Sequence, residues 1–405
     1  MLRTLLVLLF FPLCLHAQPD REAFERYQFL VLDSNFIHVN GQNLETAFQN
    51  LDSLIKRGDR QLRVLQIGDS HIQAGYFSDR VREDLQQTFA LDNGGRGFLF
   101  PYRIGNTNNP LNFGVSYTGE WLSCRNMQRN LDCDLGLSGM SATTYDDEAT
   151  LSINPNRGKA EKPYQITRIK IFYDRLPSSY NVMIEEAKVI EITDYKQYRE
   201  FILLKPVEEI NITFEKADVA QNHFTLYGLT LESDDPGIMY SSVGINGADV
   251  TAWLRCNLMD SQLSVLNPQL VIISLGANDA YPKVFDVDGF KHNYTRLIKE
   301  IRTSIPKASI LLTTPGDAYR YKRYYNYNYV KARQAIIELG REQECAVWDF
   351  YSIMGGANSI YDWYKNGLAA SDKIHYSVAG YNLQADLFYD ALMESYYNYL
   401  QKRNN

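Results

Sequence analysis

The sequence lacks the features of several common classes of binding protein. It has no run rich in lysine and arginine, and its formal net charge is -7, so it has no basic field that would hold nucleic acid. None of its histidines belongs to an H-x-x-x-H or H-E-x-x-H pattern, and it has no C-x-x-C pair of the kind that binds metal ions. It also has no phosphate loop and no G-x-G-x-x-G after a strand-like segment. We therefore expect no metal ion, no cofactor and no nucleic-acid partner.

Long hydrophobic runs are also scarce, and the one that stands out is at the N-terminus. An apolar stretch over residues 5–15 follows a basic residue and precedes the small Ala17. This pattern predicts a signal peptide over residues 1–17 that is cleaved after Ala17. Lipidation at Cys14 is the alternative, but bulky Leu13 stands where a small residue is required. No other stretch has the roughly 18 apolar residues that span a bilayer, so we predict an exported protein, periplasmic or secreted, without a transmembrane segment in the mature chain.

Cysteine is sparse in the predicted mature chain, which keeps Cys124, Cys133, Cys256 and Cys345. Cys124 and Cys133 are close together in a polar segment and can form a disulfide in an exported protein. Two free thiols are an equally good interpretation of the same spacing.

Hydrophobic residues are plentiful, at 45% of the 405 residues, which is enough for two domains. One part of the chain alternates strand-like and helix-like segments. An apolar residue recurs at every fourth position, at Phe77, Val81, Leu85 and Phe89, and this spacing predicts a helix. A second helix is expected within residues 18–60. Alternating strands and helices predict an α/β domain of three layers, with a parallel sheet flanked by helices. Short apolar runs that end in polar, glycine or proline residues lie at 63–67, 269–279, 308–317 and 345–351.

The middle third of the chain has a different pattern. Residues 110–235 contain short segments rich in Ile, Val, Thr, Phe and Tyr, which are separated by Pro, Asn, Asp or Gly. We predict that these residues form an all-β sandwich inserted into the α/β domain. The α/β domain is then discontinuous and consists of residues 18–109 and 236–405.

Polar residues with complementary chemistry follow the strand-like runs. Ser70 and Asn278 each come directly after one, at the carboxyl ends where parallel sheets bind ligands. Asp372 stands three residues before His375, so its carboxylate can fold back to the imidazole. An imidazole held by a carboxylate activates a serine hydroxyl for acyl transfer. We therefore predict Ser70, His375 and Asp372 as nucleophile, base and orienting acid, with the Asn278 amide stabilising the oxyanion.

Neighbouring polar residues allow simpler interpretations. Asp69 and Asp279 are expected to bond loop backbone, as residues of tight turns do. His71, beside the nucleophile, either lines the pocket or packs the loop. Tyr319–Tyr329 contains six tyrosines with Arg320, Lys322 and Arg323, and it can form either a glycan-binding rim beside the site or the solvated start of a helix.

At these residues the sequence resembles the SGNH (GDSL-type) hydrolases. Four blocks match in order: Gly-Asp-Ser at Ser70, an isolated loop glycine, Gly-x-Asn-Asp at Asn278, and Asp-x-x-His at His375. The resemblance implies an oxyanion hole made by the Asn278 amide, the Ser70 N–H and the N–H of the block-two glycine. Gly244 fits that position, with Gly247 as the alternative.

Within this family the chain is most similar to the periplasmic peptidoglycan O-acetylesterases. The segments that carry this likeness are GDSHIQA at Ser70, GGRGFLFP from Gly94, GINGA from Gly244 and MGGANSI from Met354. Those enzymes carry a carbohydrate-binding-like β-sandwich inserted between blocks one and two, where residues 110–235 lie. The resemblance implies an exported serine esterase that removes O-acetyl groups from cell-wall glycan, with O-acetylated peptidoglycan as the expected substrate. An acetylesterase for xylan or a capsular glycan, a glycan O-acetyltransferase and an inactive glycan-binding protein are the alternatives.

Overall fold

The computed structural model describes residues 24–404, apart from 42, 89–92, 131 and 158–161. A central sheet is formed by β1 (Ile37–His38), β2 (Gln61–Gly68), β14 (Gly237–Gly244), β15 (Leu270–Ser274), β16 (Ser309–Thr313) and β19 (Ala346–Trp348). Its strand order is β1-β19-β16-β15-β2-β14. The strands from β19 to β14 run parallel to their neighbours, and β1 pairs antiparallel with β19 at one edge.

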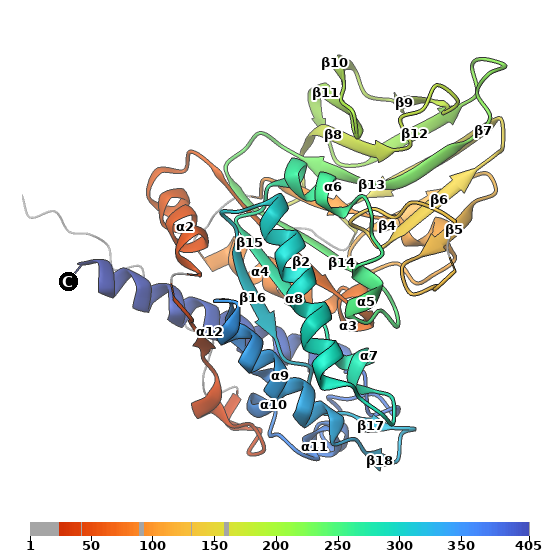
Figure 1. Ribbon diagram of the computed structural model, residues 1–405. Helices are drawn as coiled ribbons and strands as arrows, with labels where there is room; N and C mark the ends of the chain where they lie inside the picture. Colours follow the sequence, from red (N-terminus) through yellow and green to blue (C-terminus); the bar gives the residue numbers. More distant parts are fainter. Residues whose placement is uncertain (1–23, 42, 89–92, 131, 158–161, 405) are drawn as a thin grey trace, which may run out of the picture.

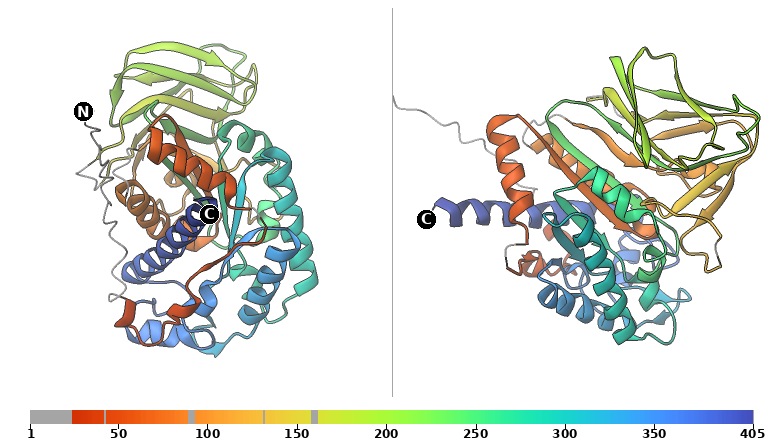
Figure 2. Two further views of the ribbon diagram at one scale, coloured as in Figure 1. Left: turned by 90° about the vertical axis from the view of Figure 1, so that its left-hand side faces the viewer. Right: turned by 45° about the horizontal axis from the view of Figure 1, so that its top comes forward.

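Helices cover both faces of this sheet (Figure 1, Figure 2). One face packs against α2 (Glu45–Arg57), α4 (Tyr76–Thr88) and α12 (Val378–Asn404), and the other against α6 (Met259–Leu266), α8 (Val287–Ser304) and α9 (Asn328–Glu342). The shorter elements are η1 (Leu32–Ser34), α3 (Ser70–Gln73), η2 (Tyr102–Gly105), α5 (Val250–Trp253), α7 (Ala277–Ala280), α10 (Phe350–Ile353), α11 (Ser359–Lys365) and the hairpin β17 (Tyr319–Arg320) and β18 (Tyr324–Tyr325).

The central strands bury side chains on both faces, as strands of a covered parallel sheet do. In β15, Ile272 joins the apolar cluster under α2, α4 and α12, whereas Val271 and Ile273 join the cluster under α8 and α9. Successive residues of a strand point to opposite faces. The apolar runs in the sequence therefore form the middle layer of the three predicted layers.

Helix α8 shows how local sequence sets an element. It begins after Asp286, whose carboxylate accepts a hydrogen bond from the Gly289 N–H and so caps the helix. Its buried stripe contains Phe290, Tyr294 and Ile301, spaced as on one face of an amphipathic helix. Helix α4 is confirmed over Tyr76–Thr88, while Phe89 lies outside the described residues.

A second set of strands makes two antiparallel sheets. Their bounds are β3 (Gly95–Leu99), β4 (Gly114–Tyr117), β5 (Leu122–Arg125), β6 (Met140–Thr144), β7 (Glu148–Asn154), β8 (Ile166–Tyr173), β9 (Asn181–Glu185), β10 (Val189–Asp194), β11 (Tyr198–Val207), β12 (Ile210–Glu215) and β13 (Phe224–Glu232). One sheet has the order β10-β11-β8-β13-β6-β5, with β3 also paired to β13, and the other has the order β4-β7-β12-β9. The rings of Phe214 in β12 and Phe224 in β13 stack with centroids 4.2 Å apart, so the two sheets share an apolar interior.

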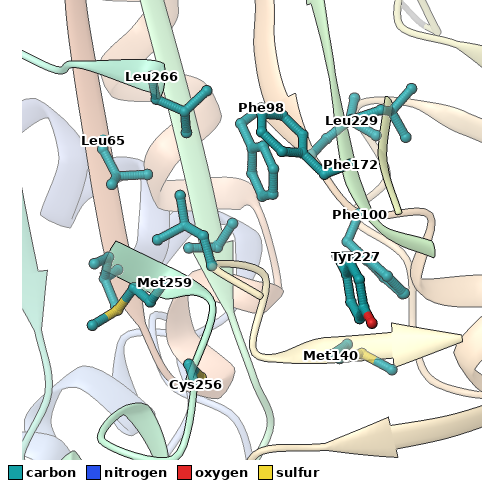
Figure 3. Packing of buried hydrophobic residues seen from close by; sticks show 14 of the residues in the cluster. Leu65, Phe98, Phe100, Met140, Phe172, Tyr227, Leu229, Cys256, Met259 and Leu266 are labelled. Atoms are coloured by element: carbon teal, nitrogen blue, oxygen red, sulfur yellow. The ribbon is translucent and has the colours of Figure 1, made fainter. Parts of the chain in front are cut away.

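The antiparallel sheets pack on the α/β layers through one continuous apolar cluster (Figure 3). This cluster contains Leu65 of β2 and Met259 of α6, and also Phe98, Phe172 and Leu229 of the antiparallel strands. Strand β3 lies before residue 110 and yet pairs with β13. The division into residues 18–109, 110–235 and 236–405 stays a prediction.

The N-terminal segments of the described chain only partly follow the expectation. Residues 45–57 form the expected helix, α2, which packs on the α/β layers. Ile37, however, lies in the edge strand β1, and Phe36 is exposed. The predicted signal peptide, with Cys14 and Ala17, lies outside the described residues.

Cys124 and Cys133 form a disulfide. This decides between the two interpretations of their spacing. Cys256 and Cys345 are free and buried. Among the helices of the described residues, none is both long and apolar enough to cross a bilayer.

Candidate active site

Three neighbouring parallel strands end at one level of the sheet, and the candidate site begins there. Gly68 at the end of β2 pairs in register with Gly244 of β14 and with Ser274 of β15. Ser70 starts the short helix α3 directly after β2, and Asn278 lies in α7 directly after β15. Because parallel strands place their carboxyl ends at the same edge, residues far apart in sequence meet at this point.

The structure brings Ser70, His375 and Asp372 together. Ser70 Oγ lies 2.9 Å from His375 Nε2, and His375 Nδ1 lies 2.7 Å from Asp372 Oδ2. The second carboxylate oxygen of Asp372 accepts hydrogen bonds from the backbone N–H groups of Ile374 and His375, at 2.9 and 3.0 Å. The short turn before α12 therefore fixes the carboxylate on the imidazole, as the spacing predicts.

The charge of the Asp372 carboxylate is favoured by these bonds. Partial burial raises its pKa, but the hydrogen bonds from the His375 ring and from the backbone outweigh burial and lower the pKa below the ordinary value. An ionised carboxylate at Nδ1 holds that proton on the imidazole and leaves Nε2 free to accept the Ser70 proton. The His375 side chain is 39% exposed, so a substrate can reach the pair from solvent.

The side-chain amide of Asn278 is held between two acceptors. Its Nδ2 donates to the carbonyl oxygen of Ala248 at 3.0 Å and lies 3.4 Å from Asp69 Oδ2. Asp69 precedes the nucleophile candidate, so the second N–H of the amide is directed toward the Ser70 loop. Both N–H groups are thus bonded inside the protein, and the longer bond, to Asp69, is the one that an oxyanion would have to replace. The role of Asn278 as an oxyanion donor stays a prediction.

The two candidate block-two glycines have different surroundings. Gly244 donates its N–H to Tyr102 Oη at 3.2 Å, and a Cβ at this position would lie 2.4 Å from the Gln73 N atom. Gly247 is exposed, has a φ of 82° and is a central residue of the turn that the Ala248 N–H closes on the Ile245 carbonyl oxygen. Since the Gly244 N–H is already bonded inside the protein, this geometry favours Gly247 as the donor, and the choice between the two stays a prediction.

Asp69 and His71 flank Ser70; Asp69 is buried and His71 is half-buried. Asp69 caps α3 by accepting the His71 N–H at 3.0 Å, and burial raises its pKa to about 6. Burial, followed by the nearby His375, lowers the pKa of His71 to about 3. Its ring centroid lies 5.0 Å from that of His375, and its Nδ1 lies 3.0 Å from Tyr381 Oη. His71 is therefore a neutral ring that packs against the candidate base.

Asp279 bonds backbone, as expected. Both of its carboxylate oxygens accept the Val250 N–H, at 3.2 and 3.3 Å. This contact joins the Asn278 loop to the start of α5. Burial, followed by the nearby Asp249, raises the pKa of Asp279 to about 7.

A cavity of about 40 Å³ lies next to the Ser70–His375 pair. Asp69, His71, Tyr329, Tyr376 and Gln384 are among the residues that line it, but Ser70 and His375 do not. A cavity of this size holds water molecules rather than an acyl group with its sugar. The reacting face of Ser70 is therefore the solvent-exposed one.

Some side chains of the site were not singled out from the sequence. Tyr102 bonds Gly244 and Tyr381 bonds His71, but neither tyrosine belongs to a motif with recognisable spacing. Gln73 accepts the Asn246 N–H at 2.7 Å and so ties α3 to the block-two loop. The position of Gln73 in the GDSHIQA segment is the sequence signal that could have identified it as a residue of the site.

No group of three or more His, Cys, Asp or Glu side chains that could hold a metal ion occurs among the residues the structure describes. The expected absence of a metal ion or cofactor stays a prediction.

Comparison with known proteins links this site to a family. Residues 223–383 match the model of the GDSL-like Lipase/Acylhydrolase family. The matched segment contains Asn278, Asp372 and His375 and begins after Ser70 and most of the antiparallel strands. A comparison with curated protein sequences finds no match.

Solved structures give a second comparison. A peptidoglycan O-acetylesterase is 23% identical, with a TM-score of 0.75 over 89% of this chain and 99% of that chain. A lipase/acylhydrolase from Enterococcus faecalis is 23% identical over 38% of this chain and 74% of its own, with a TM-score of 0.31. A family two carbohydrate esterase from Clostridium thermocellum is 11% identical over 69% and 98%, also with a TM-score of 0.31. The peptidoglycan O-acetylesterase shares the fold of this chain, including its antiparallel strands. From the family match over residues 223–383, we conclude that this chain contains a GDSL-type (SGNH) hydrolase domain.

Proposed function

We propose that the protein is an exported serine esterase that removes O-acetyl groups from cell-wall glycan, with peptidoglycan as the substrate. The observation that carries this proposal is the continuous hydrogen-bonded series from Ser70 Oγ through the His375 ring to Asp372, at 2.9 and 2.7 Å. A serine, an imidazole and a carboxylate in this order are the elements of nucleophilic acyl transfer.

The first half of the reaction transfers the acetyl group to the enzyme. His375 Nε2 takes the Ser70 proton as Oγ bonds to the ester carbonyl carbon. The oxyanion that forms is stabilised by the Asn278 amide together with backbone N–H groups. His375 then gives its proton to the departing sugar oxygen, the ester bond breaks, and an acetyl group remains on Ser70.

The second half releases acetate. His375 Nε2 takes a proton from water, whose oxygen attacks the acetyl carbonyl carbon. The bond to Ser70 Oγ then breaks, Oγ recovers its proton from His375, and acetate leaves. Throughout both halves Asp372 keeps the Nδ1 proton in place and stabilises the imidazolium.

Two observations support the substrate and the compartment. The chain shares its fold, over nearly its whole length, with a structure named as a peptidoglycan O-acetylesterase. The Cys124–Cys133 disulfide suits an oxidising compartment such as the periplasm or the exterior, in agreement with the predicted signal peptide.

Acetate release by the mature chain tests this function. We expect acetate from O-acetylated peptidoglycan at a higher kcat/KM than from acetylated xylan, and no release above background by Ser70→Ala. Faster release from xylan would assign the enzyme to another polysaccharide. Equal rates for Ser70→Ala and the wild type would exclude the serine mechanism.

A further inference from the structure

A surface of tyrosines and cations lies beside the candidate active site. We call it the tyrosine–cation patch and define it by Tyr319, Tyr321, Tyr324, Tyr361, Tyr364, Lys365 and Lys373. It is built from the β17–β18 hairpin, from α11 and from the turn that carries Asp372 and His375. Figure 1 shows this hairpin next to α11, at the same end of the molecule as α7.

The patch is bonded to both loops that form the site. The Tyr319 N–H donates to the Lys373 carbonyl oxygen at 2.9 Å, and Lys373 stands between Asp372 and His375. On the other side, the Tyr321 N–H donates to Tyr281 Oη at 3.3 Å, three residues after Asn278. The patch therefore adjoins the loop that carries His375 and the loop that carries Asn278.

Four of the five tyrosines of the patch are exposed to solvent, and Tyr319 is half-buried. The exposed fractions are 69% for Tyr321, 54% for Tyr324, 40% for Tyr361 and 41% for Tyr364. Flat aromatic faces pack well on the apolar faces of sugar rings, while the hydroxyl groups remain available for hydrogen bonds. This part of the patch fits a glycan.

Lys373 lies among these rings. Its Nζ is 5.2 Å from the ring centroids of Tyr319 and Tyr361, and 5.5 Å from that of Tyr364. Lys365 Nζ lies 4.3 Å from the Tyr361 centroid. Contacts between a cation and an aromatic ring at such distances are attractive, so the ammonium groups are held at the surface on which the sugar rings would rest.

The charge of the patch is positive on balance, with Asp362 of α11 and Asp372 as the nearby acidic residues. The hairpin adds Arg320, Lys322 and Arg323 to Lys365 and Lys373, and none of these cations forms an ion pair within the part of the chain that the structure describes. The whole chain carries a net charge of -7. A local excess of positive charge on an acidic protein indicates an anionic ligand.

The backbone under the patch is unusual for the side chains that it carries. Tyr321, Lys322 and Lys373 have φ values of 53°, 63° and 53°, in the left-handed region that favours glycine and asparagine. Tyr321 and Lys322 are the central residues of a turn closed by the Arg323 N–H on the Arg320 carbonyl, at 3.3 Å. Long side chains at such positions are consistent with a binding role that glycine could not fill.

We propose that the tyrosine–cation patch binds carboxylate-bearing glycan and so makes the enzyme prefer acidic over neutral polysaccharide. The proposal rests on the proposed function for the site itself. The tyrosine rings hold sugar rings, and Lys365 and Lys373 pair with carboxylates along the chain. The peptide carboxylates of peptidoglycan, beside its sugar rings, provide this combination, whereas a neutral acetylated xylan lacks it.

Binding by the catalytically blocked chain tests this proposal separately from the reaction. The mature Ser70→Ala chain is co-sedimented with peptidoglycan sacculi and with the same sacculi after their carboxylates have been converted to methylamides. We expect amidation to weaken binding, and the double change Lys365→Met/Lys373→Met to weaken binding to native sacculi about five- to tenfold. Methionine keeps the length of lysine and removes its charge.

The matched control is Lys299→Met/Lys307→Met in the same Ser70→Ala chain. Both lysines are exposed; Lys299 lies near the end of α8 and Lys307 just before β16, at the opposite edge of the sheet. The control should bind native sacculi like its parent, and circular dichroism verifies that both variants fold. The proposal would be overturned if the Ser70→Ala chain bound native and amidated sacculi equally, or did not bind sacculi at all. It would also be overturned if both double variants bound equally, or if the chain bound a single-stranded oligothymidine more tightly than sacculi.

Discussion

Asn278 donates its side-chain amide to the carbonyl oxygen of Ala248, 3.0 Å away. This bond fixes the plane of the amide and directs its other N–H toward Asp69 Oδ2, at 3.4 Å, on the loop that carries Ser70. The amide is thus oriented before any substrate arrives. The bond to Ala248 holds this orientation, and the longer contact with Asp69 is the one that a developing oxyanion would replace.

Replacing Asn278 with alanine should therefore reduce kcat more than it changes KM. We expect a loss of about 10²- to 10³-fold in kcat for acetyl ester hydrolysis. Steady-state kinetics with O-acetylated peptidoglycan and with p-nitrophenyl acetate measures the effect. A variant that keeps the wild-type kcat on both substrates would show that Asn278 only shapes its loop.

Replacing Asp372 with asparagine should reverse the proton arrangement of His375. The new amide would donate to Nδ1, leave the proton on Nε2 and so prevent removal of the Ser70 proton. We expect kcat to fall by about 10⁴-fold while the fold is kept.

A matched control for this change is Asp218→Asn. Asp218 is exposed and accepts the N–H of Ala220 two residues on, as Asp372 accepts that of Ile374. The control should leave kcat unchanged. Similar kcat values for Asp372→Asn and the control would remove Asp372 from the mechanism.

Stability should fall with rising pH in the range where Asp279 ionises. Its pKa is near the ordinary value of about 3.9 in the unfolded chain, and burial followed by the nearby Asp249 raises it to about 7 in the folded protein. The folded state binds more protons in this range, so the contribution is complete below about pH 4 and is lost as the pH rises to about 7.

The variant Asp279→Asn keeps an oxygen that can accept the Val250 N–H and removes this titration. Its free energy of unfolding should decrease less steeply between pH 4 and 7, by up to about 1.4 kcal/mol per pH unit. Urea denaturation at several pH values measures the slope. An unchanged slope would show that Asp279 titrates alike in both states.

The disulfide should stabilise the loop between β5 and β6. Cys124 and Cys133 are nine residues apart, and closing a loop of this length is worth about 2–3 kcal/mol in the chain-entropy model. Replacing both cysteines with alanine should lower the free energy of unfolding by that amount. After denaturation without a reductant, thiol titration of the mature chain should find Cys256 and Cys345 alone; four reactive thiols would contradict the pairing.

The arrangement of the candidate site could be predicted largely because strand ends coincide in a parallel sheet. Ser70 and Asn278 follow recognisable apolar runs, and the Asp372–His375 spacing is local. The resemblance to the SGNH hydrolases added the order in which the four sequence blocks occur along the chain. Ser70 and His375 thus lie within hydrogen-bonding distance despite a separation of 305 positions.

Other features depend on long-range contacts that leave little signal in the sequence. Strand β3 is the short segment GRGFL, with two glycines among its five residues, and only its pairing with β13 makes it a strand of the antiparallel sheet. The bond from Gly244 to Tyr102 Oη depends on how η2 packs under β14. The spacing of Cys124 and Cys133 was compatible with both a disulfide and free thiols, because it does not give the distance between them.

Labelling with a fluorophosphonate followed by mass spectrometry tests most directly whether His375 activates Ser70. The wild-type mature chain should gain one adduct, on the peptide that contains Ser70, and His375→Ala should react far more slowly at that residue. An adduct on a different serine, or equal labelling rates for His375→Ala and the wild type, would contradict the account.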